Sequence, residues 1–129
     1  MNKILVEVSV GELLDKISIL EIKQEKIKDP AKLKFINEEH SILKDQFNSN
    51  VKSDQRLSEL FESLKQINAK LWVIEDDKRK CEKEKDFTDT FIKLSRDVHF
   101  LNDDRAKIKL EINNHTGSKI KEIKEYTSY

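Results

Sequence analysis

The stretch LSELFESLKQINAKLWVIEDDKRKC, residues 57–81, repeats apolar side chains with heptad spacing. Its apolar positions are Leu57, Leu60, Leu64, Ile67, Leu71 and Ile74, and the series continues to Cys81. Such a repeat keeps one face of a helix apolar and is typical of helices that pack as in a coiled coil. It predicts a long helix over residues 53–83, with Ser53 as its N-cap.

A second long helix is expected after a charged turn near residues 83–86. Residues 87–115 carry a similar apolar series, formed by Phe87, Phe91, Leu94, Val98, Leu101, Ile108 and Ile112. Because the turn is short, the two long helices should form an antiparallel hairpin.

Two shorter helices precede this hairpin. Ser9 and Glu12 have the spacing of a capping box, which predicts a helix over residues 10–28. The pair Asp29-Pro30 supplies an N-cap and a first-turn proline for a helix over residues 30–48. The short links predict that both hairpin turns lie at the same end of the molecule.

The four helices predict an all-α fold, an antiparallel helical bundle built from a short and a long hairpin in one domain of residues 1–129. A short extended N-terminus precedes them, where Ile4, Val6 and Val8 alternate as in a strand. Gly117 is typical of the residue that ends a helix. The tail, residues 117–129, repeats apolar residues at every third position, and a strap, a helix and a strand all remain open for it.

Composition agrees with a helical protein and excludes some functions. The chain of 129 residues has only two glycines and one proline, and 39% of its residues are charged. Because 25 basic residues balance 25 acidic ones, no general nucleic-acid binding is expected. No stretch approaches the roughly 20 apolar residues of a membrane span, and the start lacks a signal-peptide pattern. With Cys81 as the single cysteine, a cytoplasmic location is expected.

Three ionisable residues, Glu21, His40 and Glu75, interrupt the apolar faces of the first three helices. Counted from the two turns, all three lie about 15 Å along the helices and are expected to form one polar layer. A hydrogen-bonded layer that holds the helices in register is the favoured interpretation. A metal site is less favoured because no helix carries a Glu-x-x-His pair, and we expect neither a metal nor a cofactor.

Arg105 interrupts the fourth helix about 15 Å farther along, beyond reach of Glu75 and near the start of the first helix. Helix-start amides beside a guanidinium can bind an anion. The residues of such an anion site are Ser9, Gly11, Asn102, Arg105 and Lys109. The favoured alternative is that Arg105 is half exposed, or that it pairs with Glu62 or another carboxylate.

Several segments spread over nearly the whole chain carry a family resemblance. They are VSVGELLDKISILE at residues 8–21, LWVIEDD at 71–77, NDDRAKIK at 102–109 and the Gly117-Ser118 tail. Together they resemble a family of small uncharacterised all-helical bacterial and phage proteins. The resemblance implies a helical fold and, because some relatives accompany glycosyltransferase genes, a link to surface-glycan metabolism.

Two functions are therefore expected. The first is a small helical accessory or interaction module, whose longer second hairpin leaves part of its seam uncovered for a protein partner or for a dimer. The second is the binding or transformation of a small anionic metabolite, a sugar phosphate or nucleotide, at Arg105 and the start of the first helix, with Glu75 or Glu21 as a base.

Overall fold

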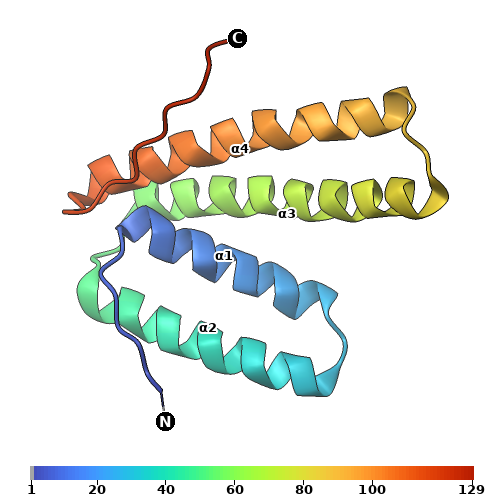
Figure 1. The fold of residues 1–129 in the computed structure, drawn as a ribbon. Coiled ribbons are helices and arrows are strands. Elements are labelled where there is room, and N and C mark those ends of the chain that lie inside the picture. The colour runs from blue at the N-terminus through green and yellow to red at the C-terminus, as the bar shows by residue number, and fades with distance from the viewer. Residues whose placement is uncertain (1) are drawn as a thin grey trace.

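The computed structural model describes residues 2–129 and contains four α-helices (Figure 1). They are α1 (Val10–Lys26), α2 (Pro30–Asn50), α3 (Gln55–Glu84) and α4 (Asp89–Thr116). Residues 2–129 contain no strand, so the predicted all-α class is confirmed. None of these helices combines the length and the apolar character needed to cross a membrane.

Side-chain caps and one glycine fix where the helices begin and end. The Ser9 hydroxyl accepts a hydrogen bond from the amide three residues on at 3.0 Å, as predicted. α3 is capped by Asp54, and the predicted Ser53 cap is wrong, because the Asp54 carboxylate is the one that reaches a first-turn amide, at 2.8 Å. Gly117 ends α4 as predicted, with a left-handed φ of 67° that a glycine adopts without strain.

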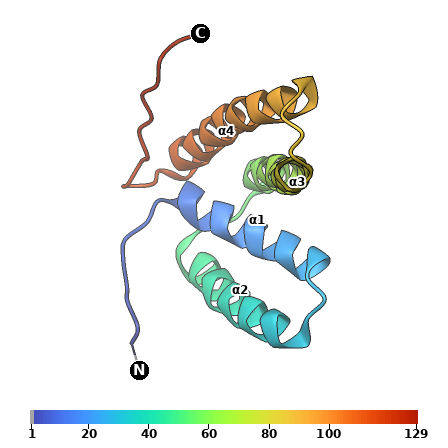
Figure 2. The same ribbon diagram turned by 45° about the vertical axis from the view of Figure 1, so that its right-hand side comes forward.

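The central helix of the fold is α1. α3 and α4 lie side by side as an antiparallel pair, α1 packs against that pair, and α2 lies on the far side of α1 (Figures 1 and 2). Among the helices of residues 2–129, the α2 backbone comes close only to α1. The main buried cluster joins all four helices and consists of Leu14, Ile17, Phe47, Leu57, Leu60, Leu64 and Ile112.

The α3–α4 hairpin extends well beyond the end of α1 (Figure 1). Both turns lie at the same end, as predicted, but the α3–α4 turn lies farther out because α3 has 30 residues and α1 has 17. After Leu71, the hairpin has Cys81 as its one buried residue until Lys109. We refer to residues 72–101 as the arm and to the remainder of the hairpin as the base.

The tail forms neither helix nor strand, and it crosses α4 and then rises away from it (Figure 1). Glu122 of the tail contacts Lys109, and the ring of Tyr129 lies 5.5 Å from that of Phe100. These side-chain contacts hold the tail to α4 as a strap, the first of the three expected conformations. Residues 2–9 form neither helix nor strand, and Ile4 is 85% exposed, so the strand-like alternation there pairs with nothing.

Candidate functional site

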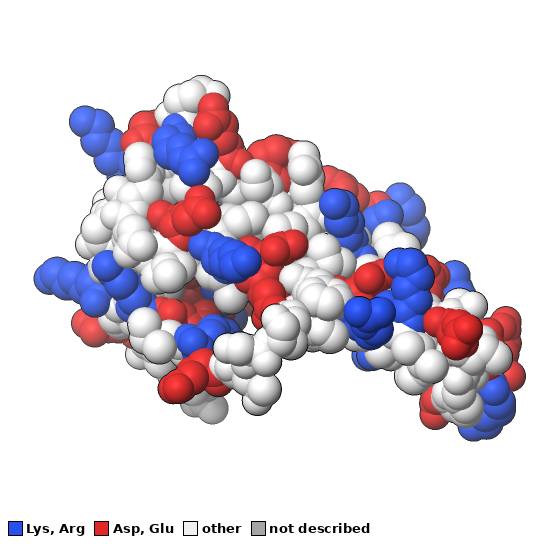
Figure 3. Space-filling view, turned by 90° about the horizontal axis from the view of Figure 1, so that it is seen from above, with Lys and Arg blue, Asp and Glu red and all other residues white. Residues whose placement is uncertain are grey.

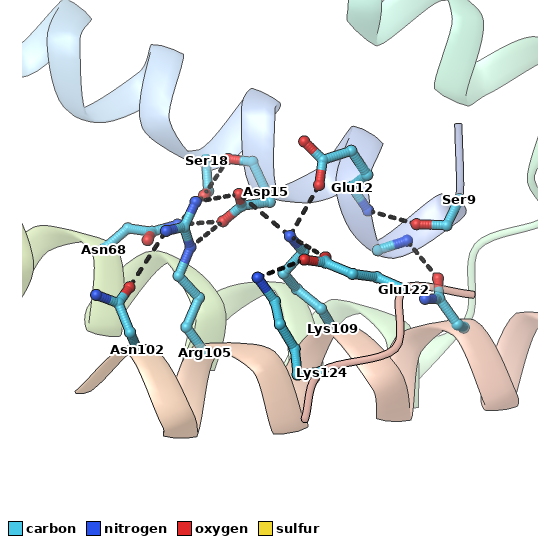
Figure 4. A network of polar contacts seen from close by, with 12 residues as sticks. Ser9, Glu12, Asp15, Ser18, Asn68, Asn102, Arg105, Lys109, Glu122 and Lys124 are labelled. Carbon is cyan, nitrogen blue, oxygen red and sulfur yellow. Dashed lines mark hydrogen bonds and ion pairs between the residues drawn. The ribbon is translucent and has the colours of Figure 1, made fainter. Parts of the chain in front are cut away.

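Six charged side chains gather where α1 meets α4 and the tail, and Figure 4 shows them close together. We call them the charge cluster: the carboxylates of Glu12, Asp15 and Glu122, and the cations of Arg105, Lys109 and Lys124. As many cations as carboxylates take part, so the cluster is electrically balanced.

Asp15 is the partner of Arg105. Its carboxylate is 2% exposed, accepts a hydrogen bond from Arg105 Nε at 2.9 Å and accepts a second from Arg105 Nη2. Such a forked pair is the strongest geometry available to arginine and a carboxylate. The expected pairing of Arg105 with a carboxylate therefore occurs, but the carboxylate is on α1 and is not Glu62.

A buried polar group from α3 completes the environment of Asp15. Asn68 Nδ2 donates to the Asp15 carboxylate at 2.9 Å and to the Ser18 hydroxyl at 2.8 Å. The Ser18 hydroxyl donates in turn to the backbone carbonyl of Asp15 at 2.8 Å. No buried side-chain nitrogen or oxygen within residues 2–129 lacks a hydrogen-bond partner. The network thus ties α1, α3 and α4 together without unsatisfied groups.

Lys109 is the most enclosed cation of the cluster, with 7% of its surface exposed. Its ammonium lies 2.8 Å from Glu12 and 2.8 Å from Glu122. Burial acts to lower the pKa of Lys109, but the hydrogen bonds to these two carboxylates outweigh it and the pKa is raised. Lys109 is therefore fully charged at neutral pH.

Glu122 lies between two ammonium groups. Its Oε2 lies 2.8 Å from Lys109 and its Oε1 lies 2.8 Å from Lys124. The hydrogen bond from Lys109, followed by the one from Lys124, lowers the pKa of Glu122 to about 2. A carboxylate of the tail is thus held as an anion at this site.

The start of α1 differs from what the sequence predicted. The Gly11 amide donates to Asn113 Oδ1 at 2.7 Å and the Val10 amide donates to the Ser118 hydroxyl at 3.2 Å. A Cβ at Gly11 would lie 2.6 Å from the carbonyl oxygen of Lys109, so this glycine permits close packing of α1 on α4. The amides expected to receive an oxyanion already have protein acceptors.

The predicted anion-site residues therefore divide into two groups. Asn102, Arg105 and Lys109 line one polar pocket of about 400 Å³, which the tail also lines. Ser9 and Gly11 do not line it, and they take part in capping and helix packing instead. Sequence reasoning missed Asp15 and Glu122, although the Asp15-x-x-Ser18 pair on one side of an apolar stripe was a signal for the first.

The predicted polar layer forms in part. His40 Nε2 and Glu21 Oε2 lie 3.1 Å apart, and Lys65 contacts Glu21 at 3.4 Å. Glu75 is not part of this layer and pairs with Arg79 at 2.7 Å on the same helix. The prediction placed Glu75 by counting residues from the α3–α4 turn and Glu21 by counting from the α1–α2 turn. It was wrong because the α3–α4 turn lies farther out, so equal counts do not place the two residues at the same height along the helices.

Residues 2–129 contain no group of three or more His, Cys, Asp or Glu side chains placed to hold a metal ion. Cys81 is a free buried cysteine, and burial raises the pKa of its thiol. A protonated thiol is a poor nucleophile, and Cys81 acts as a small core residue.

An apolar groove of about 650 Å³ opens between α3 and α4 where the arm meets the base. Its lining residues are Ala69, Lys70, Val73, Ile74, Asp97, Phe100 and Leu101. Val73 is 48% exposed and Phe100 is 39% exposed. This groove and the charge cluster are two surfaces with the chemistry to bind another molecule.

Comparison with known proteins identifies a family and gives no activity. No curated protein and no solved structure matches the chain. Residues 4–129 match a family of unknown function, DUF6165. Since the match covers nearly all of the sequence, the chain belongs to the DUF6165 family.

Proposed function

We propose that this protein is a helical interaction module that associates with a second copy of itself through the arm. The observation that carries the proposal is the apolar groove between α3 and α4, where Val73 and Phe100 are exposed. Apolar surface of this kind is stabilised when another apolar surface covers it. The lining residues all belong to α3 and α4, so α1 leaves the groove open.

The charges at the groove support a second copy as the partner. Lys70 lies on α3 and Asp97 lies on α4, so the groove has one charge of each sign on its two sides. A two-fold axis along the hairpin sets α3 of each copy over α4 of the other. That arrangement brings each Lys70 close to the Asp97 of the second copy and forms a four-helix contact between the two arms.

The size of the arm supports a reversible contact. From Ala69 to the turn, α3 is about 24 Å long, and two helices side by side are about 20 Å wide. The face is therefore about 500 Å² per copy, or about 1,000 Å² in total, near the lower limit of specific interfaces. We expect a dimer that dissociates at low protein concentration.

The anionic-metabolite function has weaker support. Glu21 pairs with His40 and Lys65, and Glu75 pairs with Arg79, so both carboxylates suggested as a base are already engaged. Arg105 is engaged by Asp15. For this reason we place the interaction function before catalysis.

Two further expectations remain part of the proposal. We propose a cytoplasmic location in a bacterial or phage-infected cell, in accord with the free thiol of Cys81. A link to surface-glycan metabolism rests on the family resemblance of the quoted sequence segments.

Sedimentation equilibrium over a hundredfold range of concentration tests the proposal. The weight-average mass of the wild type should rise from that of one chain toward that of two. Val73→Asp places a charge in the groove and should keep the protein monomeric at concentrations where the wild type is dimeric. Ile92→Asp is the matched control, because Ile92 is 52% exposed and lies outside the groove, and it should dimerise as the wild type does. A wild type that stays monomeric throughout, or a control that fails equally, contradicts the proposal.

A further inference from the structure

The position of Glu122 is that of a ligand held between two cations. Each of its carboxylate oxygens lies 2.8 Å from one ammonium, that of Lys109 or that of Lys124 (Figure 4). The side chain belongs to the tail, a segment with no regular secondary structure, and it lies in the polar pocket that Asn102 and Arg105 also line.

We propose that this pocket is a binding site for a small carboxylate or phosphate ion, and that Glu122 of the tail occupies it in the free protein. The ligand's oxyanion takes the place of the Glu122 carboxylate between Lys109 and Lys124. The remainder of the ligand lies along α4, where Asn102 supplies an amide and Tyr126 a ring. A pocket of about 400 Å³ suits a metabolite of small size.

Charge balance argues for an anion in this place. Without Glu122, the ammonium of Lys109 would lose one of its two carboxylate partners at 2.8 Å, and the ammonium of Lys124 would lose its carboxylate contact. Lys109 is 7% exposed, so it is poorly hydrated and depends on protein partners. Removing one carboxylate contact from an enclosed ammonium is costly, and an oxyanion from solution restores that contact.

Glu122 is placed to exchange with such a ligand. Its side chain is 34% exposed, so rotation about its own bonds brings the carboxylate into water. The tail does not have to leave, because Ser118 holds one end at the α1 amide and the Tyr129 hydroxyl donates to Asp103 at the other. Lys124 therefore stays at the pocket while Glu122 moves out.

A ligand anion has to displace the Glu122 carboxylate, so the affinity measured for the wild type is lower than that of the empty site. A tethered group competes at an effective concentration of about millimolar or more, so a simple anion binds the wild type only weakly. The variant Glu122→Gln removes the competing charge and keeps the shape of the side chain. Inorganic phosphate and succinate, titrated calorimetrically at constant ionic strength, should bind this variant with a Kd at least tenfold lower than that for the wild type.

The matched control is Glu125→Gln, because Glu125 is an exposed tail residue and the substitution changes the net charge equally. It should bind both probes as weakly as the wild type, and adding Lys124→Gln to Glu122→Gln should weaken binding again. Tighter binding of phosphate identifies a phosphorylated ligand, and tighter binding of succinate identifies a carboxylic acid. If Glu122→Gln and Glu125→Gln do not differ, or if neither probe binds Glu122→Gln, the proposal is wrong.

Discussion

The base and the arm of the α3–α4 hairpin share one apolar repeat but hold their charges in different ways. In the base, α1 covers the hairpin and the charges of Asp15 and Lys109 are enclosed among partners from several segments. In the arm, Glu75 and Arg79 pair one turn apart on a single exposed helix face. Basic and acidic side chains alternate over the surface seen in Figure 3, including its projecting part. In the base, ion pairs connect different segments of the chain and help to fix how they pack. In the arm, the Glu75–Arg79 pair connects residues of one helix only, and the apolar groove between α3 and α4 stays uncovered.

The largest expected effect is that of removing the carboxylate at the centre of the base. Asp15→Ala leaves Arg105 without its carboxylate and removes one of the two acceptors of the Asn68 amide, and should lower the free energy of unfolding by about 3–5 kcal/mol. Urea denaturation followed by circular dichroism measures this. The counterpart in the arm, Glu75→Ala, should cost about 0.5 kcal/mol or less, because exposed pairs contribute little. Equal losses for the two variants would refute the distinction between base and arm.

The close packing of α1 on α4 gives the next effect. In Gly11→Ala the new Cβ would lie 2.6 Å from a backbone carbonyl oxygen of α4, so the helices must separate. We expect a loss of about 2 kcal/mol in the free energy of unfolding, measured in the same way. The control is Gly117→Ala, where space is free but φ is +67°, and which should cost about 1 kcal/mol. A neutral Gly11→Ala would mean that the contact between α1 and α4 is looser than the structure has it.

The attachment of the tail predicts a dependence on pH. The pKa of Glu122 is lowered from 4.5 to about 2, chiefly by the hydrogen bond from Lys109. A carboxyl with a lowered pKa in the folded state contributes stability that is complete above its unfolded pKa and is lost as pH falls from about 4.5 to about 2. Because Glu122 is about one-third exposed, we expect a contribution of only about 1 kcal/mol.

Thermal unfolding of the wild type and Glu122→Gln measures that contribution. The difference in stability between them should shrink between about pH 6 and about pH 3. A difference that stays constant over this range would show that Glu122 is not held by the ammonium groups.

Local features of this fold were predictable from the sequence. The Ser9 cap, the Gly117 helix end and the heptad series each depend on residues within a few turns of one another. The sequence could predict that Arg105 pairs with a carboxylate, but not with which one. Its partner Asp15 is 90 positions away in the chain. The contact between them depends on how α1 lies on the hairpin.

Apart from the Ser53 cap, which missed the true cap Asp54 by one residue, the failures of prediction come from long-range packing. Glu75 was placed in the polar layer by counting residues from two turns, and the count fails because the arm extends past α1. Glu122 could not be assigned to Lys109, since the apolar residues at every third position of the tail fit a strap, a helix or a strand and do not fix its path. Both depend on long-range packing, which one sequence does not specify.

Amide hydrogen exchange of the wild type at low and high protein concentration tests the central distinction most directly. If the arm and its groove are the surface of self-association, amides of residues 69–101 should exchange more slowly at high concentration, while those of the remainder of the base stay unchanged. The effect should disappear in Val73→Asp and persist in Ile92→Asp. Exchange in the arm that is independent of concentration, or protection gained in the base instead, would contradict the account.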